Sequence, residues 1–295
     1  MTRRWELLRA LGAAADSPAA ARAVAAPLGL PPVSDAEHTD VFVLNCPPYA
    51  SVYLGPDGAL GGEGADRVAG FWRAIAITPP AEPDHLTALL SLYASLGEAA
   101  AEARRPATAQ ALTRSRQGLF AEHVWPWLPA YLDAVADLAV PALTAWAELT
   151  RRVVVAESGA QPVWPRLPLA LRAAPDGIGP GPGLIDALTT PVRSGIILTR
   201  RRLAAGAEET GVGYRIGERR YALRAMFGQD PDATLAWAAR EAMRWQRRHA
   251  GRAAGDQVAR WWAGRARRTG LLLRQRAASA GTGQIMRADA HRARR

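Results

Sequence analysis

Apolar residues recur every three to four positions through most of the chain, and this helical spacing is the feature that most limits the fold. One such stripe comprises Leu86, Leu89, Leu90, Tyr93 and Leu96. Residues with this spacing lie on one face of a helix. The β-branched runs at 41–44 and 153–155 are short and have no neighbouring strand pattern with which to pair. The sequence therefore predicts an all-α fold.

Prolines indicate where several of these helices begin or break. Asp230-Pro231-Asp232 combines a capping side chain, a first-turn proline and an acid, which is typical of a helix start. Pro141 lies inside a long apolar stripe over residues 131–149. Because proline removes a backbone donor and clashes with the preceding turn, we expect it to kink or split that helix.

A change in composition divides the chain. Seven prolines lie between Gly159 and Pro191, counting Pro191 itself, and they interrupt any regular element. The predicted organisation is an N-terminal helical half at 1–158, a Pro/Gly-rich connection at 159–191, a C-terminal helical half at 192–276 and a disordered basic tail at 277–295. Connections of this length are usually functional or mobile.

Composition excludes several kinds of chemistry. All 37 Lys+Arg residues are arginine, so a P-loop lysine and a Schiff-base lysine are both ruled out. A single cysteine excludes a disulfide framework. The five histidines lack the i, i+4 spacing of a helical zinc site, and the glycine-rich run 177–183 follows no strand. These features argue against a metal site and a dinucleotide-binding loop, and the lack of a recognisable active site disfavours an enzyme.

The N-terminus contains two arginines, Arg3 and Arg4, but the segment after them does not read as a signal peptide. Glu6, Arg9 and Asp16 interrupt the apolar run that a signal peptide needs. Trp5, Leu7, Leu8 and Leu11 have helical spacing instead. No uncharged apolar run reaches about 18 residues, so no membrane span is predicted. These features favour an amphipathic first helix and a cytoplasmic protein.

Charge is distributed unevenly. Residues 1–200 hold 16 arginines and 19 acids, whereas residues 201–295 hold 21 arginines and 8 acids. One hypothesis is therefore a helical nucleic-acid-binding protein, with arginines on phosphates and tryptophans stacked on bases. Its residues would be Arg240, Arg244, Arg247, Arg248, Arg260, Arg265, Arg267, Arg268, Trp245, Trp261 and Trp262. The alternative is a solvated arginine-rich helix and tail.

Two short segments combine acids, a histidine, aromatic residues and prolines. The first is Glu82-Pro83-Asp84-His85-Leu86, and the second runs from Leu119 to Tyr131 and contains His123-Val124-x-x-Trp127-x-Pro129-x-Tyr131. With these segments the chain resembles the TorD/DmsD family of molybdoenzyme-specific chaperones, also called redox enzyme maturation proteins. That family carries a Glu-Pro-x-Asp-His element, from which this chain lacks one residue, and a His-Leu-x-x-Trp-x-Pro-x-Phe element.

The resemblance implies a TorD-like helical bundle and a cytoplasmic chaperone. Such a chaperone binds the twin-arginine leader and the body of a molybdoenzyme catalytic subunit until the client's molybdopterin cofactor is inserted. A twin-arginine leader has two guanidinium groups before an apolar stretch, so its receptor needs carboxylates beside apolar side chains. The expected leader-binding residues are Trp72, Glu82, Asp84, His85, Leu89, Tyr93, Glu122, His123, Trp125 and Trp127.

Two further questions stay open in the sequence. His85 would either face the leader or bond back to the start of its own helix. The family contains monomers and domain-swapped dimers, and no residue decides between them here. The client, the binding of a guanine nucleotide and the role of the basic end are likewise not determined by the sequence.

Overall fold

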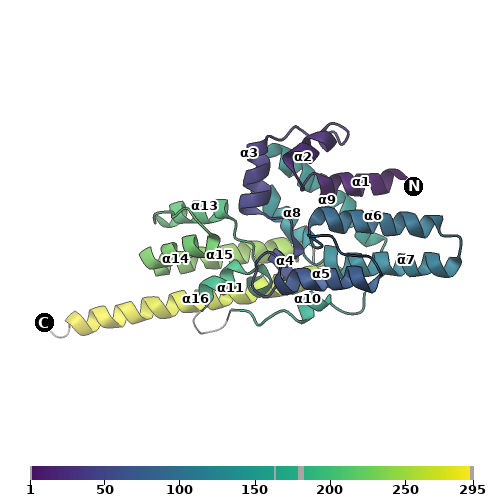
Figure 1. Ribbon diagram of the computed structural model, residues 1–295. Coiled ribbons are helices and arrows are strands. Elements are labelled where there is room, and N and C mark those ends of the chain that lie inside the picture. The colour runs from purple at the N-terminus through teal and green to yellow at the C-terminus, as the bar shows by residue number, and fades with distance from the viewer. Residues whose placement is uncertain (1, 163, 179–182, 293–295) are drawn as a thin grey trace. The chain divides into compact units, whose positions relative to one another are not determined.

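The helical spacing of the sequence is reproduced throughout the molecule. The computed structural model describes residues 2–162, 164–178 and 183–292, and their regular structure consists of helices (Figure 1). The described residues contain no strand, although Tyr49 and His85 form an isolated antiparallel bridge. The all-α prediction is confirmed.

The chain divides into two compact units, Met1–Ala174 and Pro175–Arg295. The boundary between the units falls inside the segment 159–191 that the sequence predicts as a connection. Residues of this segment pack into both units. Ala170 and Leu171 are buried in the first unit, and Leu188 is buried in the second.

The first unit contains ten α-helices and two π-helices within its described residues. They are α1 (Thr2–Ala13), α2 (Pro18–Ala25), α3 (Asp35–His38), η1 (Thr39–Asn45), α4 (Ala50–Leu54), α5 (Gly62–Ala74), α6 (Leu86–Glu102), α7 (Pro106–Leu119), η2 (Phe120–Val124), α8 (Leu128–Ala136), α9 (Pro141–Gly159) and α10 (Leu169–Arg172). Helices α6 and α7 lie side by side, and α1 packs on α6 (Figure 1).

The second unit is built around a pair of long helices, α15 and α16. Its elements are α11 (Leu184–Thr189), α12 (Pro191–Ser194), α13 (Arg200–Thr210), α14 (Arg219–Gln229), α15 (Pro231–Ala250) and α16 (Gln257–Arg292). Helices α13 and α14 also pack against α15. The backbone of α16 is helical as far as Arg292, within the segment 277–295 that the sequence analysis assigns to a basic tail.

Prolines have the effects predicted from the sequence. Helix α8 ends at Ala136 and α9 begins at Pro141, so the apolar stripe is split into two helices. Between them Ala139 has a positive φ of 54°, which reverses the chain. In the second unit, the Asp230 side chain accepts a hydrogen bond of 2.9 Å from the Ala233 backbone and caps α15.

Helix α1 is amphipathic, as predicted, and is fixed through an aromatic contact with a glycine. Trp5, Leu8 and Leu11 are buried. The Trp5 ring lies against Gly97 of α6 so closely that an added Cβ would approach ring atoms to 2.4 Å. The two helices therefore meet where α6 has no side chain.

This contact predicts opposite outcomes for two glycine substitutions. Gly97→Ala should lower the free energy of unfolding by about 1–3 kcal/mol, because the methyl group displaces the Trp5 ring. Gly70→Ala in α5 is the matched control, since no heavy atom lies within 4 Å of its added Cβ. The control should raise stability by about 0.5–1 kcal/mol. Denaturant unfolding measures both, and equal effects would contradict the close packing.

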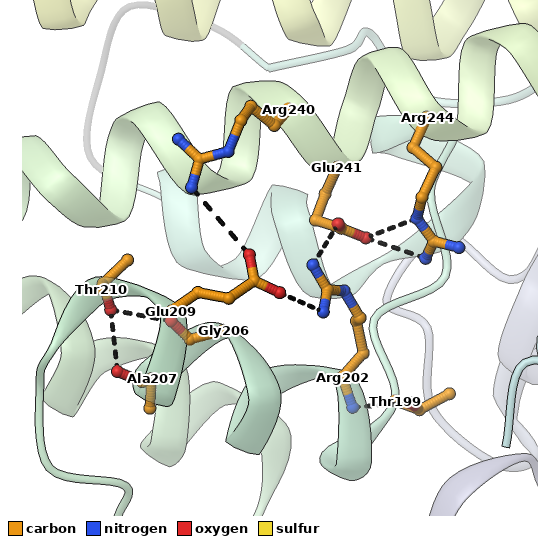
Figure 2. Close-up of polar contacts among 9 residues, drawn as sticks. All are labelled: Thr199, Arg202, Gly206, Ala207, Glu209, Thr210, Arg240, Glu241 and Arg244. Atoms are coloured by element: carbon orange, nitrogen blue, oxygen red, sulfur yellow. Dashed lines mark hydrogen bonds and ion pairs between the residues drawn. The ribbon is translucent and has the colours of Figure 1, made fainter.

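The second unit repeats this kind of contact with a buried ion pair beside it. An added Cβ at Gly206 of α13 would lie 2.3 Å from the Trp237 ring. Next to that ring, Arg202 pairs with the buried carboxylate of Glu241 at 2.6 Å and with Glu209 at 2.6 Å (Figure 2). Arg244 also bonds Glu241, at 2.9 Å. The flat guanidinium forks satisfy the buried carboxylate and link α13 to α15.

His249, near the end of α15, is buried as a neutral ring. Its Nε2 lies 3.2 Å from the Gly195 carbonyl, and the Trp245 and Trp262 rings flank it at 5.3 and 5.8 Å. Burial, followed by the nearby charge of Arg252, lowers its pKa to about 3. The folded protein therefore holds this side chain uncharged at neutral pH.

The lowered pKa predicts loss of stability in acid. The unfolded chain protonates this histidine near pH 6.5, so its stabilising contribution is complete above about pH 6.5 and declines as the pH falls toward 3. Between pH 7.5 and 5 the loss should be about 2 kcal/mol. Unfolding of the native protein and of His249→Gln across this range tests it, and the variant should lose about that much pH dependence. An unchanged pH dependence would contradict a buried neutral ring.

None of the helices in the described part of the chain is both long enough and apolar enough to cross a membrane.

Candidate functional site

The first motif lies where two helices of the first unit begin. The Asp84 carboxylate accepts a hydrogen bond of 2.8 Å from the Ser51 backbone, and the Asp84 carbonyl accepts one of 3.0 Å from Ala50. Both donors belong to the first turn of α4, where backbone N–H groups have no helical partner. Asp84 is only 2% exposed. Its role in the structure is therefore to cap α4 from a distant part of the sequence.

His85 caps the other helix, α6. Its Nδ1 accepts a hydrogen bond of 3.2 Å from the Thr87 backbone, which is the structural alternative considered for this residue. The next backbone N–H, of Leu86, donates to the Pro48 carbonyl at 2.8 Å. Burial lowers the pKa of His85, so the ring is held as a neutral acceptor. Asp84 and His85 thus fasten the starts of α4 and α6 to each other.

Carboxylates remain accessible beside this junction. Glu82 and Asp16 are exposed, and both act electrostatically on the Tyr49 hydroxyl and on His85. Burial, followed by the hydrogen bond and charge of Glu82, raises the pKa of Tyr49 to about 12. The Tyr49 ring packs edge-on against His85 with centroids 4.7 Å apart. We call Asp16, Tyr49 and Glu82 the acidic surface.

The second motif forms the turn that leads from α7 through η2 into α8. The Trp127 Nε1 donates to the His123 carbonyl at 2.8 Å, and the Trp127 ring stacks on Tyr53 of α4 at 5.3 Å. The His123 ring meets Phe71 of α5 at 5.1 Å. Burial, followed by the charge of Arg67, lowers the pKa of His123 to about 4. His123 and Trp127 therefore belong to the core of the first unit.

Helices α4 and α5 bring the two motifs together. Helix α4 contacts the first motif through Ser51 and the second through Tyr53. In α5 the Trp72 Nε1 donates to the Pro83 carbonyl at 3.2 Å, while the adjacent Phe71 meets the second motif. The motifs, about 40 residues apart in the sequence, are thus two sides of one packed framework.

A buried carboxylate that the sequence analysis missed lies at Glu157 of α9. It is 3% exposed and forms a two-point ion pair with Arg4 of α1. The Tyr93 hydroxyl donates to Glu157 at 2.6 Å and accepts from Arg116 at 2.8 Å. These contacts join α1, α6, α7 and α9. Nothing in the sequence around Glu157 distinguishes it from an exposed helix acid, because its partners are distant in the chain.

Most residues expected on a leader-binding surface have buried side chains. They are Trp72, Asp84, His85, Leu89, Tyr93, His123 and Trp127. In the structure these side chains belong to the helix starts and to the packed core of the first unit. Glu82 is exposed, and Glu122 and Trp125 are partly exposed. Glu122 accepts a hydrogen bond of 2.7 Å from the Leu169 backbone, and Trp125 stacks on Phe120 at 5.7 Å.

The described residues contain no group of three or more His, Cys, Asp or Glu side chains that could hold a metal ion. The sole cysteine, Cys46, is buried.

Comparison with known families agrees with the position of these motifs. Residues 30–133 match the nitrate reductase delta subunit family. The family is one of molybdoenzyme maturation chaperones, and the match covers about a third of the chain, from before η1 into α8. No curated protein and no solved structure shows significant similarity to the chain. The matched region contains both motifs and the two helices that join them.

The capping role of Asp84 can be tested directly. Asp84→Ala should lower the free energy of unfolding by about 1–3 kcal/mol, since it leaves a buried backbone donor of α4 without its acceptor. Glu82→Ala, two residues earlier and exposed, is the matched control and should change stability by less than about 0.5 kcal/mol. Denaturant unfolding measures both. Equal effects at the two positions would show that the cap does not stabilise the unit.

Proposed function

We propose that the protein is a chaperone that binds the twin-arginine leader of a molybdopterin-dependent oxidoreductase. It assists the folding of this client and the insertion of the client's cofactor before export. The observation that carries the proposal is the match of residues 30–133 to a family of molybdoenzyme maturation chaperones. The matched region contains both segments on which the resemblance to TorD/DmsD proteins rests.

The acidic surface is where we place the two arginines of the leader. Asp16 and Glu82 are the exposed carboxylates next to the junction of α4 and α6, and Tyr49 adds a flat ring beside them. Arginine binds carboxylates through paired N–H donors and packs on aromatic faces. Asp84 and His85 support this surface because they fix the starts of α4 and α6.

Exposed apolar side chains would take the stretch that follows the arginines. Val43 and Leu44 of η1 are 62% and 40% exposed and lie shortly before Tyr49 in the sequence. Trp125 is partly exposed on the second motif, next to Glu122. Burying a few such side chains gives about 1.5–3 kcal/mol each before ordering costs, which is compatible with a reversible peptide complex.

The remaining parts of the proposal concern the setting of the protein. It acts in the cytoplasm without catalysing a reaction and without a cofactor of its own, since the client carries the molybdopterin. Its partners are the leader and the body of the client's catalytic subunit, with the chaperone either a monomer or a domain-swapped dimer.

The hypothesis of a nucleic-acid-binding protein depends on arginines that contact phosphates and on tryptophans that stack on bases. The positions of the tryptophans do not favour it. Trp245 and Trp262 are 1% and 3% exposed, so their rings are not available to stack on bases. The Trp261 ring is covered on one face by Arg265, whose guanidinium lies 4.7 Å from its centroid. The exposed arginines alone give no reason to prefer nucleic acid over other anions.

Binding of a synthetic twin-arginine leader peptide tests the proposal. Asp16→Asn and Glu82→Gln should each weaken binding about 10- to 100-fold, because each removes a charge-assisted hydrogen bond. Glu148→Gln, an exposed acid of α9, is the matched control and should leave affinity unchanged. Fluorescence anisotropy with labelled peptide gives the affinities. A peptide with both arginines changed to alanine should bind the native protein weakly. Its affinity should be similar to that of the native peptide for a variant that carries both Asp16→Asn and Glu82→Gln.

Two outcomes would contradict the proposal. One is that the native protein does not distinguish the arginine peptide from the alanine peptide. The other is that the control variant loses as much affinity as the two surface variants, since this would mean that net charge alone determines binding.

A further inference from the structure

Arg265 of α16 is a buried guanidinium in the second unit. Its residue is 8% exposed. Its Nη1 donates to the Pro175 carbonyl at 2.8 Å, and its flat face covers the Trp261 ring. Its Nε is buried, and no residue in the described part of the chain accepts a hydrogen bond from it. These contacts pack the side chain and satisfy one donor, but they supply no negative charge.

A buried arginine is ordinarily matched by a carboxylate, because an unmatched charge is costly to remove from water. Arg202 of the same unit follows this rule through Glu209 and Glu241 (Figure 2). Arg265 forms no ion pair with any described residue. The nearby charges are mainly of its own sign: burial lowers its pKa, Arg268 and Arg193 lower it further, and only Asp176 opposes them.

Arg193 of α12 is a second guanidinium that forms no ion pair with the described residues. Its Nε is also buried, and no described residue accepts a hydrogen bond from it. A Cβ added at Gly177 would lie 3.5 Å from both the Arg193 carbonyl and the Arg265 Nη1, so the two residues are neighbours across this glycine. The Thr269 hydroxyl donates to the Ser194 carbonyl at 2.7 Å and holds α12 against α16.

The three arginines differ in their access to solvent. Arg265 is buried, Arg193 is partly exposed and Arg268 is exposed. An anion can therefore reach Arg268 and Arg193 from solvent, while Arg265 supplies charge from the interior. Asp176 is exposed and leaves the group with a surplus of positive charge.

We propose that Arg193, Arg265 and Arg268 form a binding site for a phosphate group, either as inorganic phosphate or as the monoester of a small molecule. Guanidinium forks match the oxygens of phosphate in pairs. A phosphate dianion offsets two of the three positive charges, with its oxygens on the accessible guanidinium groups of Arg193 and Arg268 and the charge of Arg265 behind them. The site is independent of the leader-binding proposal, because all of its residues lie in the second unit.

Thermal unfolding of the full chain tests this site. Sodium phosphate should raise the Tm of the native protein relative to sodium chloride of equal ionic strength, because a ligand of the folded state stabilises it. Arg193→Gln should weaken phosphate binding at least about tenfold, measured by calorimetric titration. Without phosphate the same variant should match or exceed the native Tm, since it relieves repulsion between like charges. Glycerol 3-phosphate in place of inorganic phosphate distinguishes a monoester from the free ion.

Arg267→Gln is the matched control. Arg267 is an exposed arginine of the same helix and carries the same charge, so the variant should retain the phosphate-induced Tm shift. If Arg193→Gln and Arg267→Gln lose the phosphate-induced Tm shift equally, the shift reflects the general positive charge of the protein. This result would overturn the proposed site. Absence of any phosphate-specific shift in the native protein would overturn it as well, and this result does not depend on whether a variant folds.

Discussion

The first unit depends on one polar junction, where Asp84 and His85 supply the acceptors for the starts of α4 and α6. Backbone donors at a helix start need partners, and here they are buried where water does not provide them. The side chain and carbonyl of Asp84 satisfy α4, and His85 satisfies α6. Helix α4 then carries Tyr53 to the second motif. The motif residues therefore hold the scaffold, and the accessible residues beside them are available for binding.

Arginine performs in both units the task for which other proteins also use lysine. The buried carboxylates of Glu157 and Glu241 each receive arginine N–H donors, from Arg4 in the first unit and from Arg202 and Arg244 in the second. Tryptophan packed on a helix glycine lies beside each pair. A planar fork can fill such a site with paired bonds, whereas an ammonium group cannot. The use of arginine rather than lysine thus suits the paired hydrogen bonds that these buried carboxylates accept.

Local patterns predicted the helices well, because apolar spacing, the Asp230 cap and the Pro141 break act over a few residues. They did not predict which motif residues would be exposed. Asp84 and His85 have the chemistry of a binding site, yet their partners at Ser51 and Thr87 become evident only when α4 is packed beside them. Glu157 was missed for the same reason, since its partners come from three other helices. Burial of a polar residue is a property of the packed unit and has no local signature.

The pairing of Arg4 with Glu157 also has a consequence for the order of events during synthesis. The two residues are 153 positions apart, so helix α1 leaves the ribosome long before its buried partner exists. At about 5–20 residues per second, that interval is about 8–30 s. Throughout it, Trp5 and the apolar face of α1 have no completed core to enter. The synthesis of α9 therefore sets the earliest time at which Arg4 can form its buried ion pair.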